Sequence, residues 1–407
     1  MGYNKTITTS ISLVVALGGF LLGFDSAVIS GAIPFMTTYF GLKELQVGWT
    51  VSSFIVGVIV GNGLSGPLSD RFGRKKILLL TAVFFAVSAV SSALAKEFWF
   101  LVIARIIGGV GVGGALLIAP VYIAEISPPA IRGKMVSFNQ LNIVIGISAA
   151  YFSNYFLLNI GENNWRWMLG VETIPAILYF VFLLYVPNSP RWLARQNRTE
   201  DAFSTLKKIG DQVYAKTQLE EIKISLQTEI SEKLWPLLKG LFSKKMSYIL
   251  ILALAISFLQ QITGINAVLY YAPVIFEKTG IGKDAAFMQA AIVGLTNLVF
   301  TILAMAIIDK LGRKPLLIIG SAGLVLSLIT LSLFSYLGKF SGYGVLIAVM
   351  VYVASFAVSL GPVLWVFLSE VFPNKYRGIG ISLAGLWASV VSFGVTFIFP
   401  WEIEFLG

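Results

Sequence analysis

The sequence predicts an all-α membrane protein, because its composition is apolar, its apolar residues form long runs, and its charges lie between those runs. Of 407 residues, 57% are hydrophobic and only 12% are charged, against about 25% charged in a usual soluble domain. The mean hydropathy is +0.84. A soluble chain this poor in charge could not cover its surface, and the same composition excludes a disordered or fibrous chain.

Eleven apolar runs are long enough to cross a bilayer as helices, which takes about 20 residues each. They do not alternate as transmembrane strands do over about 10 residues. The first run is too long for a removed signal peptide and lacks its cleavage site. The expected spans are 11–36, 46–68, 77–95, 98–124, 135–158, 167–187, 247–275, 285–308, 315–337, 343–369 and 379–400.

The basic residues predict the orientation of these spans. Of 30 Lys and Arg, 23 lie on the same side as the N-terminus, 6 lie on the opposite side, and Arg105 lies inside a span. Because positive loops stay in the cytoplasm, we expect a multi-pass protein of the bacterial plasma (inner) membrane with a cytoplasmic N-terminus. The net charge of +10 is then explained without a nucleic-acid partner.

The chain contains no Cys and no His. Disulfides and thiolate sites are therefore excluded, and the commonest general base and metal ligand is missing. No cluster of carboxylates points to catalysis. We therefore expect a protein that is not an enzyme and that holds no metal and no cofactor.

Two charged motifs occur twice in the same order. Segment 70–76, which follows the second span, recurs as segment 309–315 after the eighth span, 239 residues later. A Glu that ends a span, followed seven residues later by Arg, recurs after 245 residues. Such recurrence at nearly one offset is typical of duplicated halves. The recurring pairs are Glu125 with Arg132 and Glu370 with Arg377.

The repeat predicts the domain organisation. Residues 1–187 form an N-terminal bundle of six spans, 188–246 a cytoplasmic helical linker, and 247–407 a C-terminal bundle of five spans. The offset places a twelfth span near residue 412, beyond residue 407, so this span is expected to be missing from the chain.

Six sequence motifs carry a resemblance to a known family. They are GFDSAVISG at 23–31, DRFGRKK at 70–76, PVYIAE at 120–125, PNSPRW at 187–192, QQITGIN at 260–266 and GPVLW at 361–365. Together they resemble the sugar porter family of the major facilitator superfamily, and bacterial D-xylose:proton symporters in particular. The resemblance covers about 11–400 and implies the major facilitator fold, with two six-helix bundles and a central site between them.

The resemblance also implies a function. It implies a monomer in the lipid bilayer that takes up a monosaccharide, either a pentose or a hexose such as xylose or glucose, with protons and by alternating access. An uncoupled sugar facilitator is one alternative. A non-transporting sugar sensor is another, although a sensor is expected to carry a long cytoplasmic output segment, which does not follow the last span.

Acidic and basic residues at the predicted cytoplasmic ends of the spans are candidates for gating. Arg is favoured at helix C-termini and can hold a carboxylate through two parallel hydrogen bonds, so such pairs could close the inner side and separate when it opens. The alternative is that they only set the topology. The first expected cluster is Asp70, Arg71, Arg74, Glu125 and Arg132, and the second is Asp309, Arg313, Glu370 and Arg377.

Three ionisable residues lie well inside spans, where an ion costs at least about 2.5–3.5 kcal/mol and is therefore a functional candidate. They are Asp25, Arg105 and Glu172, and all three fall in the outer half of the N-terminal bundle. Burial favours the neutral form of a carboxyl and a neighbouring Arg favours its ionised form, so such a group can take up and release protons. We expect Asp25 to carry the proton with Arg105 as its partner. The alternative is a permanent structural ion pair.

Amides and aromatic rings inside the spans are candidates for binding a sugar. Amides donate and accept hydrogen bonds, as sugar hydroxyls require, and buried amides are costly without partners. Thr263-Gly264 could loosen the seventh span and bring its amides together, and Gly361-Pro362 marks a hinge. The alternative is that the amides only join helices. The resemblance to sugar porters implies that the sugar contacts are Gln140, Gln260, Gln261, Asn266, Tyr270, Asn297 and Trp365.

The glycine run 109–114 fits the dinucleotide-binding pattern G-x-G-x-x-G. That pattern requires a preceding strand and a βαβ unit, whereas this run lies inside an apolar span. We therefore interpret it as a surface for close helix packing, together with Gly57 and Gly61 of the second span.

Overall fold

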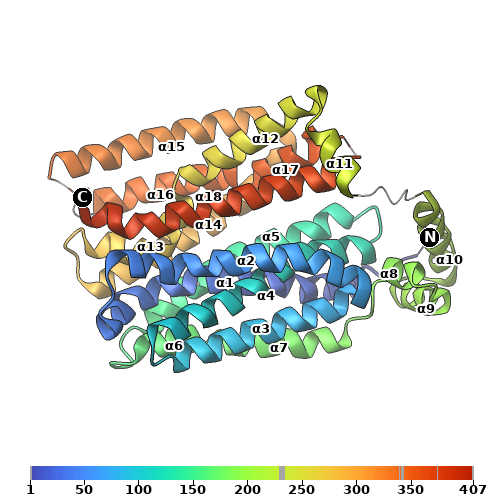
Figure 1. Ribbon diagram of the computed structural model, residues 1–407, viewed down its shortest axis with the longest axis horizontal. Coiled ribbons are helices and arrows are strands. Elements are labelled where there is room, and N and C mark those ends of the chain that lie inside the picture. Colours follow the sequence, from blue (N-terminus) through green and yellow to red (C-terminus); the bar gives the residue numbers. More distant parts are fainter. Residues whose placement is uncertain (1, 229–233, 339, 341–342, 374, 406–407) are drawn as a thin grey trace. The chain divides into compact units, whose positions relative to one another are not determined.

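The computed structural model describes residues 2–228, 234–338, 340, 343–373 and 375–405, which are mostly helical (Figure 1). Within these residues, eleven helical segments are long and apolar enough to cross a membrane. The predicted all-α membrane fold class is therefore confirmed. Most of the segments extend a few residues beyond the predicted apolar runs, because their polar ends continue the helix.

The helices of the first six spans and of the linker come first along the chain. They are α1 (Lys5–Phe40), α2 (Glu44–Phe72), α3 (Arg74–Leu94), α4 (Phe98–Ile126), α5 (Arg132–Leu157), α6 (Asn164–Gly170), α7 (Thr173–Tyr185), α8 (Pro190–Arg195), α9 (Thr199–Ile209), α10 (Gln212–Thr228) and α11 (Leu234–Leu241).

The remaining helices form the last five spans. They are α12 (Lys244–Ile262), α13 (Ile265–Glu277), α14 (Lys283–Leu311), α15 (Arg313–Tyr336), α16 (Tyr343–Val358), α17 (Leu360–Val371) and α18 (Arg377–Phe405).

Three spans consist of two helices each. The sixth is interrupted between α6 and α7 next to Glu172, and the seventh at Gly264, which has the left-handed φ of 83° that favours glycine. The predicted loosening at Thr263-Gly264 is therefore confirmed. The tenth span is interrupted between α16 and α17. Its hinge, expected at Gly361-Pro362, lies instead at Ser359, with φ −118° and ψ −94°. Proline is tolerated in the first turn of a helix, so Pro362 lies inside α17 without ending it.

The residues group into two compact units. Unit 1 comprises Met1–Asp25, Val56–Gly146 and Gly170–Ser231, and unit 2 comprises Ser26–Ile55, Ile147–Leu169 and Glu232–Gly407. Helices α1, α2, α5 and α6 therefore contribute residues to both. The predicted division into halves at 187 and 247 stays a prediction.

In unit 1, α3 packs against α4 and α7 (Figure 1), and α4 packs closely against α2. A Cβ atom on Gly113 would lie 2.7 Å from the backbone N of Asn62, and one on Gly61 would lie 3.0 Å from Cα of Val110. Only glycine allows the two backbones to approach this closely. The glycine run 109–114 therefore packs helices together, as the sequence predicts.

In unit 2, α12 packs against α18, α15 against α16, and α13 against α14. A buried cluster joins the short helix α11 to the span that follows it and to α17, through Leu241, Met246, Leu250, Leu364 and Phe372. The break between α12 and α13 lies further along the chain, at the half-buried Thr263 and Gly264.

In unit 1, the first residues of the chain join the linker helices. Tyr3 and Gly210 form an antiparallel bridge, and the N–H of Asn4 donates to the carbonyl of Ile209 over 2.7 Å. Asp211 accepts from the N–H groups of Tyr214 at 2.7 Å and Gly2 at 2.9 Å. These hydrogen bonds hold the pKa of Asp211 below its usual range. Asp211 thus caps α10 and fixes the chain start.

Candidate functional site

Asp25 of α1 and Arg105 of α4 form a buried ion pair in unit 1. Arg105 Nη1 donates to Asp25 Oδ1, and Nη2 donates to the Asp25 carbonyl over 3.2 Å. Both side chains are at most 2% exposed. Asp25 Oδ2 has no hydrogen-bond partner in the described part of the chain. A Cβ on Gly108 would lie 2.8 Å from this oxygen, so glycine leaves the space beside it. The carboxyl thus has one oxygen bonded to Arg105 and one without a partner.

Glu172 lies at the interruption between α6 and α7 and is 3% exposed. The charges of Asp25 and Arg105 both act on it electrostatically. Its Oε1 has no hydrogen-bond partner within the described residues. The structure therefore brings Arg105 onto Asp25 and places Glu172 within electrostatic reach of both.

A second charged group in unit 1 joins the end of α2, the start of α3 and the end of α4. Arg74 Nη2 lies 3.0 Å from Glu125 Oε1 and its Nε 3.1 Å from Oε2, while Nη1 lies 2.8 Å from Asp70 Oδ1. The side chains of Arg74 and Glu125 are each 9% exposed, whereas that of Asp70 is 48% exposed. Three of the five residues expected in the first gating cluster are thus in contact.

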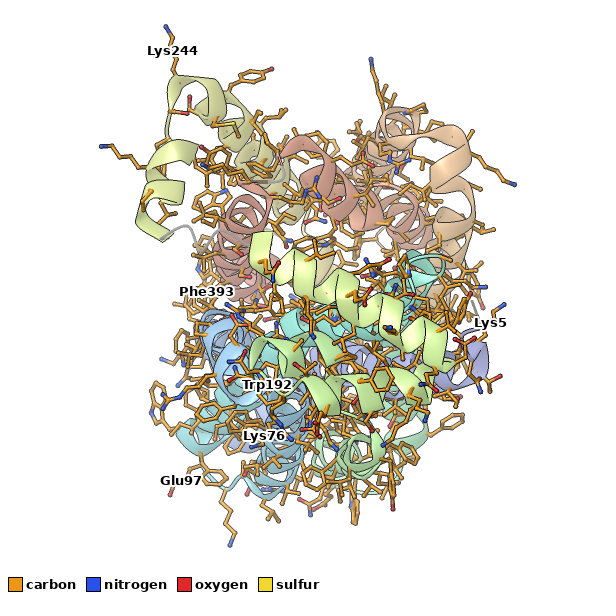
Figure 2. The ribbon with its side chains drawn as sticks, turned by 90° about the vertical axis from the view of Figure 1, so that its right-hand side faces the viewer. Lys5, Lys76, Glu97, Trp192, Lys244 and Phe393 are labelled. Carbon is orange, nitrogen blue, oxygen red and sulfur yellow. The ribbon has the colours of Figure 1, made fainter. Side chains whose placement is uncertain are left out.

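The linker adds partners to this group that the sequence reasoning did not assign to it. Ser189, at the N-cap of α8, donates from Oγ to Glu125 Oε2 over 2.5 Å. Trp192 Nε1 donates to the carbonyl of Asp70 over 3.0 Å, and Arg195 Nη1 lies 3.4 Å from Asp70 Oδ1. The motif PNSPRW indicates a helix start, since it places Ser before Pro, but it does not indicate these partners. Figure 2 shows Trp192 and Lys76 at this end of unit 1.

The other two residues of the first cluster lie apart from it. Arg71 stacks on the ring of Phe72, with Cζ 5.2 Å from the ring centroid. Arg132 is exposed at the start of α5 and acts electrostatically on Tyr214 of α10. Neither forms an ion pair with a described side chain.

In unit 2, Arg313 at the start of α15 donates from Nη2 to Glu370 Oε1 of α17 over 2.9 Å. This is the second-half counterpart of the contact between Arg74 and Glu125, with more exposed side chains, at 34% and 52%. Asp309 lies in the last turn of α14, which ends at Leu311, and its side chain lies outside the described ones. Arg377 is exposed at the start of α18 and forms no ion pair with the described side chains.

Four polar side chains form a continuous chain of hydrogen bonds across the break in the seventh span. Gln261 Nε2 donates to Gln260 Oε1 over 3.0 Å, and Asn266 Nδ2 donates to Gln261 Oε1 over 2.9 Å and to Ser392 Oγ over 2.8 Å. Gln260 Nε2 donates to the carbonyl of Leu360 over 2.8 Å. On an unbroken helix, Gln261 and Asn266 would differ by about 140° of rotation, so the break at Gly264 is what brings them together.

Two members of this arrangement carry no sequence signal. Ser392 is one of many hydroxyl residues in apolar spans. Tyr352 of α16 donates from its hydroxyl to the carbonyl of Thr263 over 2.7 Å and thereby satisfies a backbone group beside the break. The amide chain is thus supported from α16, α17 and α18.

The remaining sugar candidates lie on α5, α13, α14 and α17. Tyr270 is buried on α13, and Asn297, 7% exposed, lies on α14. Trp365 on α17 is 43% exposed, with Gly385 of α18 beside its ring. Neither Asn297 nor Trp365 is hydrogen-bonded to the amides in the described residues. Gln140 is half-buried on α5 and belongs to unit 1.

These groups combine neutral donors and acceptors with aromatic rings, which is the chemistry that a polyhydroxylated, uncharged ligand requires. No group of three or more acidic residues in the described part of the chain is arranged to hold a metal ion. In unit 1, the buried carboxyl groups supply a place where a proton can be held.

Comparisons with known proteins agree on one family. Residues 11–407 match the family described as Sugar (and other) transporter. The arabinose-proton symporter of Bacillus subtilis is 41% identical over 387 residues, covering 93% of this chain and 82% of that protein. The D-xylose-proton symporter of Escherichia coli is 40% identical, covering 98% and 86%. A partially occluded inward-open structure of the E. coli xylose transporter XylE superposes with a TM-score of 0.86 at 38% identity, covering 97% and 91%.

Proposed function

Because this chain belongs to the family of sugar (and other) transporters, we propose that it takes up a monosaccharide together with protons by alternating access. The substrate is a pentose or a hexose such as xylose or glucose. The two similar proteins named as symporters carry arabinose and D-xylose with protons. The observation that supports proton coupling is the buried ion pair of Asp25 and Arg105. An uncoupled facilitator has no need of a buried ionisable carboxyl.

The amide chain is proposed to bind the sugar. Gln261 and Asn266 present donors and acceptors at a helix break. A sugar hydroxyl can replace the hydrogen bond between these two amides, so that no polar group is left without a partner. The aromatic rings of Tyr270 and Trp365 cover its C–H faces. The full proposed set is Gln140, Gln260, Gln261, Asn266, Tyr270, Asn297 and Trp365.

Asp25 is proposed to carry the proton. When it is ionised, it is paired with Arg105. When it is protonated, the pair weakens and α1 and α4 are released from one another. Glu172 senses both charges and takes part as a second acid. Proton binding would thereby change the contact between two helices in the N-terminal bundle.

The charged groups around Glu125 and Glu370 are proposed to close the cytoplasmic side. The orientation proposed from the basic loops puts the N-terminus in the cytoplasm and the chain in the plasma membrane of a bacterium. The proposed set is Asp70, Arg71, Arg74, Glu125 and Arg132 in the N-terminal half, and Asp309, Arg313, Glu370 and Arg377 in the C-terminal half. We further propose that the halves 1–187 and 247–407 move as bundles within a monomer and that the protein transports its substrate without altering it.

Uptake into proteoliposomes tests this function. With an inward proton gradient, a panel of pentoses and hexoses should include one that accumulates above its external concentration and that makes the medium alkaline as it enters. An uncoupled facilitator would equilibrate the sugar without accumulation. A sensor would bind it without transport. Absence of both binding and transport for every monosaccharide in the panel would reject the proposal.

A further inference from the structure

Proline residues in the half-helix α13 and in α18 each remove a backbone donor. In an α-helix, the N–H of residue i donates to the carbonyl of residue i−4, and proline has no N–H. Pro273 therefore leaves the carbonyl of Leu269 without its helical donor, and Pro400 does the same to the carbonyl of Thr396. Inside a membrane such carbonyls need another donor, commonly from a neighbouring helix.

In unit 2, a tyrosine hydroxyl meets each of these two carbonyls. Tyr151 of α5 donates to the carbonyl of Leu269, and Tyr271 of α13 donates to the carbonyl of Thr396 over 3.2 Å. Both tyrosines are 1% exposed, so water does not compete at either position. Two helix pairs, α5 with α13 and α13 with α18, thus use the same device.

We infer that Tyr151 is a positioning residue that recognises the carbonyl exposed by Pro273 and thereby holds α13 against α5. The half-helix α13 begins at the left-handed Gly264 and carries Asn266 and Tyr270, so its placement fixes part of the proposed sugar site. Gln140 lies on α5. The hydrogen bond therefore connects the helix that carries one sugar candidate to the helix that carries others.

The surroundings of Tyr151 support a specific bond and not general packing. A Cβ on Gly294 of α14 would lie 3.2 Å from Cε2 of the Tyr151 ring, so glycine makes room for it. Ser148, one turn earlier on α5, donates to the carbonyl of Gly294 over 2.9 Å. The ring thus packs against Gly294, and its hydroxyl donates to the carbonyl of Leu269, which Pro273 leaves without a helical donor.

This inference rests on the proposed function in one respect, that the contact between α5 and α13 must separate when the protein opens to the outside. Loss of the Tyr151 hydroxyl should then favour the outward-open state. The double-mutant cycle with Pro273→Ala isolates the bond, because alanine at this position supplies the N–H that the carbonyl of Leu269 lacks and makes the tyrosine hydroxyl dispensable.

Cysteine labelling provides a readout that does not depend on transport, since the chain contains no Cys. Ala291 is fully buried on α14, on the helix face shared by Phe287 and Gly294. Gly294, one turn further along α14, lies against the Tyr151 ring, so Ala291 lies one turn from the contact that Tyr151 makes. In an Ala291→Cys background, Tyr151→Phe should raise labelling by a membrane-impermeant thiol reagent about threefold, the effect of an interhelical hydrogen bond of average strength.

Tyr155→Phe is the matched control, because it removes a hydroxyl one turn further along α5 where no side-chain hydrogen bond of the tyrosine is described. It should leave labelling unchanged. Pro273→Ala alone should raise labelling, and Tyr151→Phe should add nothing in that background. Equal labelling in Tyr151→Phe and the parent, or the same increase with and without Pro273, would overturn the inference. If Tyr151→Phe does not fold, unchanged labelling in Pro273→Ala alone would overturn the inference.

The experiment separates this inference from the function on which it rests. A chain that transports no sugar but shows the labelling pattern would reject the proposed function and retain the role of Tyr151. A chain that accumulates sugar with labelling unaffected by Tyr151→Phe would retain the proposed function and reject the role of Tyr151.

Discussion

Arg74 donates hydrogen bonds to both oxygens of Glu125, from Nη2 to Oε1 over 3.0 Å and from Nε to Oε2 over 3.1 Å, and its third nitrogen pairs with Asp70. One guanidinium therefore joins the ends of three helices. Arg74 and Glu125 are nearly buried, whereas Asp70 is half exposed. The carboxylates of Glu125 and Asp70 should therefore contribute unequally to holding the helix ends together.

Replacing Glu125 and Glu370 together with Gln should shift the protein toward the state open to the cytoplasm. Breaking a buried ion pair by removing one partner costs about 3–5 kcal/mol, and an exposed pair is worth only about 0–1 kcal/mol. Glu125→Gln should therefore have a larger effect than Asp70→Asn. Distances between spin labels at Lys76→Cys and Lys375→Cys measure the shift. An unchanged distance distribution in the double variant, with unchanged transport, would remove the gating role.

Asp25→Asn should abolish accumulation of sugar against its gradient, because an amide cannot bind and release the coupling proton. The ratio of internal to external sugar should fall to about 1, while exchange of labelled for unlabelled sugar continues, since exchange needs no net proton movement. Uphill uptake compared with counterflow in the same proteoliposomes measures this. Asp284→Asn, an exposed acid whose Oδ1 accepts from Asn159, is the control and should keep accumulation. Continued uphill uptake by Asp25→Asn would show that the proton is carried elsewhere.

Asn266→Ala should weaken sugar binding about tenfold or more, because it removes the central member of the amide chain and leaves Gln261 Oε1 without its donor. A buried polar group that loses its partner costs about 1–3 kcal/mol. Equilibrium binding of the transported sugar provides the measurement. Asn142→Ala is the matched control, since among the described residues the Asn142 side chain bonds only to the carbonyl of Phe138 on its own helix. Equal loss of affinity in both variants would indicate a general structural effect.

The cap at Asp211 should make the start of α10 sensitive to acid. The N–H groups of Tyr214 and Gly2 hold the pKa of Asp211 below its usual range, so its stabilising effect is full above the unfolded pKa of about 3.9 and is lost as the pH falls through the lower folded pKa. At pH 7, Asp211→Ala should speed amide exchange at Tyr214 about fivefold. The difference from the parent should disappear in acid, and Glu220→Ala should show no such difference. A pH-independent difference would contradict the electrostatic origin of the cap.

The spans and the class of fold could be predicted because each apolar run is long and bounded by charges. The break at Gly264 was also predictable, since glycine follows threonine between two amides that would otherwise face apart. The break at Ser359 was not, because Gly361-Pro362 is the stronger local signal and the proline fits a first helical turn. The interruption beside Glu172 was missed although Gly170 and Pro175 flank it, because the apolar run continues through both residues.

The candidate site was predicted where it depends on residues of unusual type and missed where it depends on ordinary ones. Asp25 and Arg105 stand out as charges inside apolar spans. Ser392 and Tyr352 do not stand out, because hydroxyl residues are common in such spans and their partners are brought close only by folding. Ser189 and Trp192 lay in a recognised motif, yet nothing in the sequence showed that they bond to Glu125 and Asp70.

The glycine seam between α2 and α4 has a practical consequence for protein engineering. Random mutagenesis aimed at a new substrate would find Gly61 and Gly113 intolerant of every replacement, in the same way as residues that touch the substrate. A deep mutational scan would therefore mark this seam as strongly as a binding pocket, and only an assay that separates folded abundance from uptake would tell the two apart.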